Sequence, residues 1–220
     1  DGRYRVQAIA VGSGQAIQMG RTGEADILWT HSPDDEELFV KDGCGNGRVV
    51  FAHNDFVILG PAADPAKVKG VKKAAEAFKK IAAAKALFVS RGDKSGTHKK
   101  ELKIWAAAKV KPAAYLEAGQ GMAATVMLAN EKNAYVLADR STYLSMKDKL
   151  GLVIVSEGDE ALLNRYSLIL VNPARFPKVN DAGAKAFYDF MLSAPARDII
   201  NGFGREKYGA QLFFYDYAVK

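Results

Sequence analysis

The stretch Ser90-Arg91-Gly92-Asp93-Lys94-Ser95-Gly96-Thr97-His98 separates an apolar run, residues 86–89, from a segment with helical periodicity, residues 99–110. A short apolar run bounded in this way favours a buried strand, and a spacing of three to four residues between apolar side chains favours a helix. The nine residues are therefore predicted to form a strand-to-helix turn.

Ser95, Gly96 and Thr97 would lie at or just before the first turn of that helix, where free backbone N–H groups point outward and the helix dipole favours negative charge. Two hydroxyls and bare amides at such a position favour anion binding. Arg91 adds a planar fork of donors that suits an oxyanion, and Asp93 could hold this fork in place by an ion pair. The plainer interpretation is an N-cap serine or threonine beside a surface arginine.

Composition limits the possible functions. The chain has 220 residues, of which 49% are hydrophobic, so it suits one large domain or two small ones. Its net charge of +6 suits an anionic ligand. The basic residues show no dense run interleaved with aromatic side chains, so nucleic acid is not an expected partner. Cys44 stands alone, which excludes an intramolecular disulfide and leaves the redox compartment open.

Strand-like and helix-like segments alternate along the chain, which predicts an α/β fold with a mostly parallel, doubly wound sheet. The expected strands are residues 5–11, 26–30, 49–51, 55–59, 86–90, 115–117, 134–138, 152–155 and 166–171. The expected helices are residues 16–23, a helix opening at 33–37, and residues 71–84, 96–109, 121–131, 140–149 and 180–203, the last broken at Ala194-Pro195.

Two further turns resemble the 90–98 turn in their chemistry. Ser13, Gly14 and Gln15 follow the first expected strand and could offer amides and a hydroxyl, although a simple capped helix start explains them equally well. Gly119 and Gly121 would permit a close approach of the backbone to a ligand.

Charged residues near these turns leave alternatives open. Glu117 would repel a dianion unless it is turned away from the site. Arg140 could pair with the adjacent Asp139 or supply a second cation near the ligand. At the carboxyl ends of strands in an open α/β sheet, such turns can converge on one ligand.

The chain is not expected to be an enzyme. Nucleophilic catalysis would need Ser95 and His98 to form a hydrogen-bonded pair, but at this spacing they point in different directions. The P-loop and Rossmann glycine patterns are missing. His31, His53 and His98 are too scattered for a zinc site, so no metal cation ligands are expected. An enzyme that handles anions is the less favoured alternative.

Residues 90–105, SRGDKSGTHKKELKIW, closely resemble the signature of tungstate-binding proteins, the solute-binding components of tungstate ABC transporters. The resemblance continues through residues 10–20, 23–33, 53–61, 78–86, 116–122, 138–144 and 211–214 and covers nearly the whole chain. A looser similarity links Arg91-x-Asp93-x-Ser95-Gly96-Thr97 to the anion loop of phosphate-binding proteins, so a phosphate- or sulfate-binding protein of the same fold is the alternative.

The resemblance implies a two-lobed, periplasmic-binding-protein-like fold of the second structural class, with doubly wound mixed sheets joined by two hinge strands. Lobe one would comprise residues 1–60 plus 167–220, and lobe two residues 61–166. A ligand would be held between the lobes, which could close on it. The expected ligand-binding residues are Arg91, Ser95, Gly96, Thr97, Ser13, Gly14, Gln15, Gly119 and Gly121, with Asp93 organising the site.

The resemblance further implies a tungstate or molybdate ligand, no cofactor, a membrane permease as partner, and a periplasmic or otherwise exported location. If Asp93 faces Arg91, it is not free to accept the proton of monohydrogen phosphate, and a proton-free oxyanion is favoured. Proteins of this family begin with a further strand and a Thr/Ser-rich loop, which have no counterpart before Asp1. We therefore expect the lobe-one sheet to have an unfilled edge, or one filled by a neighbouring chain, with a monomer otherwise.

Overall fold

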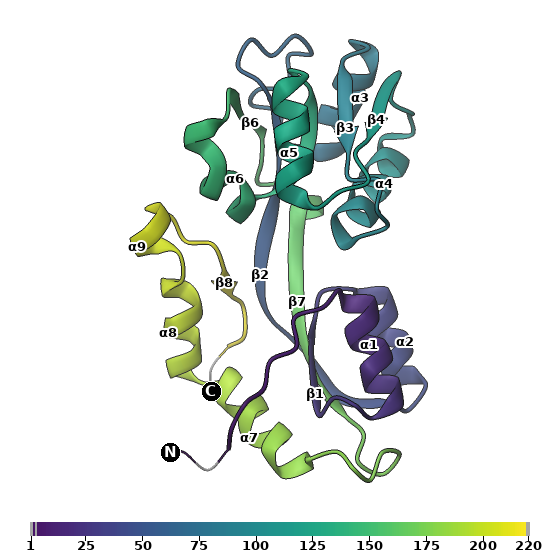
Figure 1. Cartoon of the computed structure of the whole chain (residues 1–220), viewed down its shortest axis with the longest axis vertical. Helices are drawn as coiled ribbons and strands as arrows, with labels where there is room; N and C mark the ends of the chain where they lie inside the picture. Colours follow the sequence, from purple (N-terminus) through teal and green to yellow (C-terminus); the bar gives the residue numbers. More distant parts are fainter. Residues whose placement is uncertain (1, 3, 219–220) are drawn as a thin grey trace. The chain divides into compact units, whose positions relative to one another are not determined.

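The computed structural model describes residue 2 and residues 4–218. The chain forms two compact units (Figure 1): unit 1 is residues 1–53, 165–206 and 213–220, and unit 2 is residues 54–164 and 207–212. Two strands, β2 (Gly45–Pro61) and β7 (Leu163–Val171), each contribute residues to both units. No helix among the described residues is long and apolar enough to cross a membrane.

The sheet of unit 2 contains a parallel core. Strand β3 (Leu87–Ser90) pairs in parallel with β4 (Ala114–Glu117) on one side and with β5 (Tyr135–Asp139) on the other. The second half of β2 runs antiparallel to β5, and β6 (Leu152–Ser156) runs antiparallel to β2. Parallel neighbours need crossover connections, which are supplied here by helices. They are α4 (Gly96–Ala108), between β3 and β4, and α5 (Met122–Glu131), between β4 and β5. Helix α3 (Ala74–Ala83) precedes β3, and α6 (Arg140–Met146) follows β5.

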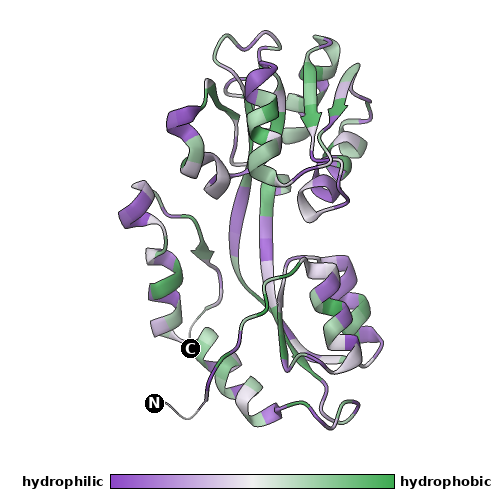
Figure 2. Cartoon of the chain, in the orientation of Figure 1, coloured by the Kyte–Doolittle hydropathy of each residue, from purple (hydrophilic) through white to green (hydrophobic). Residues whose placement is uncertain are grey.

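Alternation along the strands of unit 2 gives the sheet two buried faces. Phe88 and Tyr135 pack with the apolar residues of α3 and α4, whereas their neighbours Val89 and Val136 pack with those of α5. Successive strand residues point to opposite faces, so a strand covered on both sides reads as a continuous apolar run. Figure 2 shows this hydrophobic character along β3.

Unit 1 is built on the same principle with a smaller sheet. Strand β1 (Ile27–Thr30) pairs antiparallel with β7, β7 neighbours the first half of β2, and β8 (Phe214–Tyr215) also pairs with β2. One core contains Ile17 and Phe39, from α1 (Ser13–Thr22) and α2 (Pro33–Lys41). The other core contains Met191 and Ile200, from α7 (Asp181–Met191) and α8 (Ala194–Gly202). The short helix α9 (Arg205–Tyr208) follows.

Three expected strands differ from the structure. Residues 5–11 form no strand, and Val6 and Ile9 are 60% and 55% exposed. Their apolar alternation favours an extended chain, but a strand also needs a hydrogen-bonded neighbour. The expected strands 49–51 and 55–59 are one continuous strand, β2, because His53 and Asn54 find side-chain partners in Asp216 and Asn164 and so do not interrupt it.

The sheets are mixed, as the resemblance implies, and not mostly parallel, as the alternation predicts. Among the described residues, β3 pairs in parallel with β4 and β5, whereas β1 with β7 and β2 with β5 are antiparallel. The chain passes between units at residues 53/54 and 164/165, earlier than the expected lobe boundaries at 60/61 and 166/167, and residues 207–212 belong to unit 2. The outer edge of β1 has no strand partner among the described residues.

We expect Gly60→Ala to destabilise the protein. A methyl group at this position would lie 2.5 Å from Tyr135 Cε1. That ring is buried and fixed, because its hydroxyl donates to Asp64 Oδ1 at 2.7 Å and accepts from the Ala66 amide at 3.0 Å. Overpacking of this kind costs roughly 1–3 kcal/mol. The melting temperature, followed by circular dichroism, should therefore fall by several degrees.

The matched control for this substitution is Gly202→Ala at the end of α8, where an added methyl group meets nothing within 4 Å. This variant should melt within about a degree of the wild type or slightly above it, because alanine favours the helix. Equal melting temperatures for the two variants would contradict the packing described for Tyr135.

Candidate anion-binding site

The turn predicted between residues 90 and 98 is present. Strand β3 ends at Ser90, and α4 begins at Gly96 with Ser95 as its N-cap residue. Ser95 has an extended backbone conformation, and its Oγ accepts a hydrogen bond from the His98 amide at 3.3 Å. The capping interpretation of Ser95 is thus correct, and it is compatible with an anion site because capping uses a lone pair of the hydroxyl oxygen and one backbone amide.

Asp93 organises the loop. It forms an ion pair with the Arg91 guanidinium, and its Oδ1 accepts a hydrogen bond from the Ser95 amide at 3.1 Å. Partial burial raises the pKa of the Asp93 carboxyl, but hydrogen bonds from Ser95 and Arg91 outweigh this effect, so the pKa lies below its usual value. Asp93 is therefore ionised at neutral pH, and both of its oxygens are engaged by donors of its own loop.

The loop retains donors that have no partner. The Nε–H group of Arg91 is buried and makes no hydrogen bond with any residue that the structure describes. The amides of Gly96 and Thr97, in the first turn of α4, likewise have no acceptor within the described part of the chain. A buried donor without a partner costs free energy, so such a group indicates a place where a ligand can accept a hydrogen bond.

The neighbouring parallel strand places a second turn beside this loop. Where β4 ends, the amides of Ala118 and Gly119 donate to the carbonyls of Ser90 and Arg91 at 2.9 and 2.8 Å. Gly119 has a φ of +63°, a conformation that glycine adopts without strain. Gly121 is the N-cap of α5 and offers no side chain, so the first amides of that helix are not capped by it. In unit 2, Arg91, Ser95, Gly96 and Thr97 thus lie at the carboxyl ends of the parallel strands, as does the turn that contains Gly119 and Gly121.

The remaining predicted residues, Ser13, Gly14 and Gln15, form the first turn of α1 in unit 1. Ser13 Oγ accepts a hydrogen bond from the His31 amide at 3.2 Å, which leaves the hydroxyl proton free to donate to a ligand. Gly14 and Gln15 are exposed. Gly12 is the N-cap and provides no side-chain cap, so this helix start also presents amide donors.

Arg140 does not pair with Asp139, which instead caps α6 by accepting from the Thr142 amide at 2.8 Å. Arg140 donates to both carboxylate oxygens of Asp55, at 2.8 and 2.5 Å, and to Glu157 at 2.6 Å. The hydrogen bonds with Asp55 raise the pKa of the Arg140 guanidinium further above its already high value. This arginine is therefore a structural cation with two carboxylate partners.

The histidine geometry gives no support to catalysis. His98 is buried, and its Nδ1 lies 3.0 Å from the Lys94 amide, from which it accepts a hydrogen bond. It is therefore not a base for the Ser95 hydroxyl. Within the part of the chain that the structure describes, no three His, Cys, Asp or Glu side chains form a group that could hold a metal ion.

Sequence reasoning missed the polar network beneath the loop. Glu101 is 1% exposed and accepts hydrogen bonds from Trp105 Nε1 at 3.0 Å and from the Tyr115 hydroxyl at 2.7 Å. The i, i+4 spacing of Glu101 and Trp105 on an otherwise apolar helix face was a signal that could have identified a buried carboxylate.

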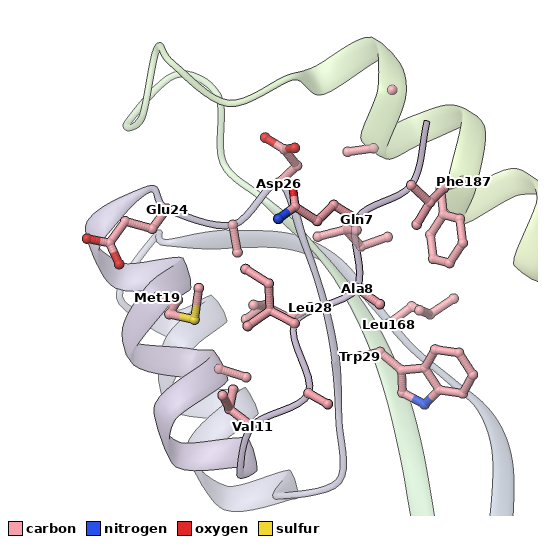
Figure 3. A pocket seen from close by; sticks show the side chains of 18 of the residues that line it. Gln7, Ala8, Val11, Met19, Glu24, Asp26, Leu28, Trp29, Leu168 and Phe187 are labelled. Carbon is pink, nitrogen blue, oxygen red and sulfur yellow. The ribbon is translucent and has the colours of Figure 1, made fainter. Parts of the chain in front are cut away.

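A cavity of about 760 Å³ lies in unit 1 (Figure 3), so it does not contain the Arg91 loop of unit 2. It lies between β1, residues 4–11, α1 and α7, with Leu28, Met19 and Phe187 among its apolar lining residues. Its walls are mostly apolar side chains and the open edge of β1, so it is unsuited to a small dianion, which needs converging hydrogen-bond donors. Ser13 is the one predicted site residue that lines it.

Comparison with known proteins agrees with this fold. Residues 2–195 match the model of the PBP superfamily domain. The chain is 48% identical over 217 residues to the tungstate-binding protein TupA of Peptoclostridium acidaminophilum, covering 97% of this chain and 76% of that protein. It is 40% identical to TupA of Campylobacter jejuni over 202 residues, covering 89% of this chain and 75% of that protein.

Solved structures give the same result. The tungstate-binding protein TupA from Desulfovibrio alaskensis superposes with a TM-score of 0.88 at 44% identity, covering 96% of this chain and 86% of that one. The tungstate ABC transporter structure from Geobacter sulfurreducens gives a TM-score of 0.77 at 44% identity, covering 89% of this chain and 84% of that one. The chain therefore belongs to the tungstate-binding protein family of ABC transporters, within the PBP superfamily.

Proposed function

We propose that this protein captures a proton-free tetrahedral oxyanion, with tungstate favoured and molybdate as the close alternative, and delivers it to the membrane permease of an ABC transporter. The relatives of this chain are tungstate-binding proteins, which supports the choice of ligand. Delivery to a permease implies a periplasmic or otherwise exported location.

The observation that carries the proposal is the set of unpaired donors in the 91–97 loop. The Arg91 Nε–H and the amides of Gly96 and Thr97 have no acceptor among the described residues. Donors at the start of a helix together with a guanidinium suit an anion. The Ser13, Gly14 and Gln15 turn of unit 1 and the Gly119 and Gly121 turn of unit 2 are proposed to supply further donors.

The state of Asp93 supports a ligand without a proton. Tungstate and molybdate are dianions that carry no proton near neutral pH, whereas monohydrogen phosphate must donate one to an acceptor. Asp93 is the carboxylate of the loop that could accept the phosphate proton, but its two oxygens already accept hydrogen bonds from Arg91 and Ser95. Each of these oxygens keeps a second lone pair, but a phosphate hydroxyl would have to share it with the donors of the loop, which favours a proton-free ligand.

The charge distribution supports capture of an anion by unit 2. Its ranges contain nineteen Lys and Arg residues against twelve Asp and Glu, a net charge of +7. The ranges of unit 1 contain twelve against thirteen, a net charge of −1. The positive balance of the chain thus belongs to the unit that carries the Arg91 loop, and such a field raises the rate at which an anion arrives.

We expect tungstate and molybdate to raise the melting temperature far more than sulfate or phosphate. A ligand at one hundred times its dissociation constant stabilises the folded state by about 2.7 kcal/mol, which corresponds to several degrees. Arg91→Ala should remove most of the shift. Arg91→Lys, which keeps the charge and loses the planar fork, should remove part of it.

The control for these variants is Arg197→Ala in α8, whose guanidinium pairs with the neighbouring Asp198 on an exposed surface. It should keep the full tungstate shift. Equal shifts for all four anions in the wild type, or an unchanged shift in Arg91→Ala, would refute the proposed site.

We also expect association to depend on the charge of unit 2. The double substitution Lys79→Glu and Lys132→Glu reverses two exposed lysines on α3 and at the C-cap of α5, outside the proposed anion loop. Stopped-flow measurements at low salt should show a several-fold lower association rate constant, and the difference should shrink as salt screens the charges. The dissociation rate constant should stay near the wild-type value.

The matched control reverses two exposed lysines of unit 1, Lys41 and Lys178, for the same change in net charge. We expect a smaller decrease of the association rate constant. If the two double variants slow association equally at low salt, the net charge of the whole protein matters and its concentration on unit 2 does not.

A further inference from the structure

Glu36 carries a fully buried carboxylate in the first turn of α2, in unit 1. Its Oε1 accepts hydrogen bonds from the Thr30 hydroxyl and from the Ser32 amide, both at 2.8 Å. Its Oε2 accepts from Arg48 Nε at 3.0 Å and forms an ion pair with Arg48 Nη2 at 2.9 Å. An acidic residue stabilises the start of a helix. This one also holds the two residues on either side of His31.

His31 connects this carboxylate to the start of α1. Its amide donates to Ser13 Oγ at 3.2 Å. Its ring lies against Tyr166 of β7, with 5.1 Å between the ring centroids. Residue 31 is thus held through its neighbours by Glu36 and through its ring by Tyr166, so the direction of its amide is restricted.

The bond from His31 determines how the Ser13 hydroxyl can act. A serine hydroxyl has one proton and two lone pairs. Because one lone pair accepts from the His31 amide, the hydroxyl proton is left for a different acceptor, and a proton-free anion offers only acceptors. If the amide moved away, the hydroxyl could rotate freely, and a ligand would have to order it on binding.

We propose that Glu36 is a positioning residue for anion binding. By holding the turn at residues 30–32, it places the His31 amide that orients the Ser13 hydroxyl toward the anion. This inference rests on the proposed function, because it assumes that Ser13 donates to the anion. Glu36 itself makes no contact with the ligand in this scheme. Its substitution should therefore alter the His31 amide in the ligand-free protein as well as the affinity.

The first test is Glu36→Gln, whose single amide oxygen cannot serve both sets of donors. A hydrogen bond from a guanidinium is stronger than one from a neutral donor, so the oxygen should face Arg48. The NH₂ group would then face the Ser32 amide, which is also a donor, and the turn should loosen.

We expect the tungstate dissociation constant of Glu36→Gln, measured by calorimetry, to rise roughly three- to tenfold, the effect of losing one well-placed hydrogen bond. In the ligand-free protein, the His31 amide should exchange its hydrogen faster than in the wild type, because its bond to Ser13 would be weaker.

Asp26→Asn is the matched control, because it makes the same change of charge at another carboxylate of unit 1. Asp26 Oδ1 accepts from the amide of Asn180, the N-cap of α7, at 2.8 Å, a bond that does not involve the 30–32 turn. This variant should melt at a slightly lower temperature but keep the wild-type affinity and the wild-type exchange of His31.

A double-substitution cycle separates positioning from general destabilisation. If Glu36 acts through Ser13, Glu36→Gln should weaken binding little further in a Ser13→Ala background. Thr30→Val removes one donor to the carboxylate and keeps the branched shape of the side chain. It takes the place of Glu36→Gln in the same cycle if that variant does not fold, and it should also speed the exchange of His31.

The outcomes are distinct. Wild-type affinity or wild-type His31 exchange in the variant used, or full additivity with Ser13→Ala, would overturn the positioning role while leaving the proposed function intact. A Ser13→Ala variant with wild-type affinity would overturn it in the same way. A wild-type protein that binds none of the oxyanions would refute the proposed function and, with it, the role of Glu36 in binding.

Discussion

The candidate site depends on one constraint, the parallel pairing of β3 with β4 and β5. Parallel strands are joined by crossover helices. Each of these three strands is followed by a turn into a helix, and the three turns lie at the carboxyl ends of the strands. The starts of α4, α5 and α6 therefore gather there, and their first amides are donors without intrahelical partners. The fold thus produces a concentration of donors before any side chain is considered, and residues 91–97 add the guanidinium.

Asp93 shows how an acidic residue can belong to an anion site. Its charge would oppose a dianion if it faced the ligand, but its oxygens are directed to Arg91 and to the Ser95 amide. The ion pair holds the guanidinium in one orientation, so less conformational freedom has to be lost when a ligand arrives. It also leaves the remaining functional groups of the loop as donors, which is the basis for discrimination against a protonated oxyanion.

Local chemistry could be predicted from the sequence, whereas long-range pairing could not. The start of α4 at Gly96 and the Arg91–Asp93 pair follow from residues within one turn of each other. Residues 5–11 have the composition of a strand, yet strand formation depends on a neighbour that composition does not specify. The sequence left Arg140 either to pair with the adjacent Asp139 or to supply a second cation near the ligand, and it pairs instead with Asp55, 85 residues away in the chain. Glu101 reads as one more charged helix residue until the structure shows Trp105 and Tyr115 donating to it.

A comparison of two buried carboxylates explains why the surroundings of Glu101 suit a place beneath an anion. Glu36 in unit 1 is 0% exposed and is neutralised by the Arg48 guanidinium at 2.9 Å, in addition to hydrogen bonds from Thr30 and the Ser32 amide. The donors to Glu101 are the neutral groups of Trp105 and Tyr115. Neutral donors satisfy the Glu101 carboxylate without a guanidinium. Arg91 pairs with Asp93 instead, and its Nε–H has no partner among the described residues.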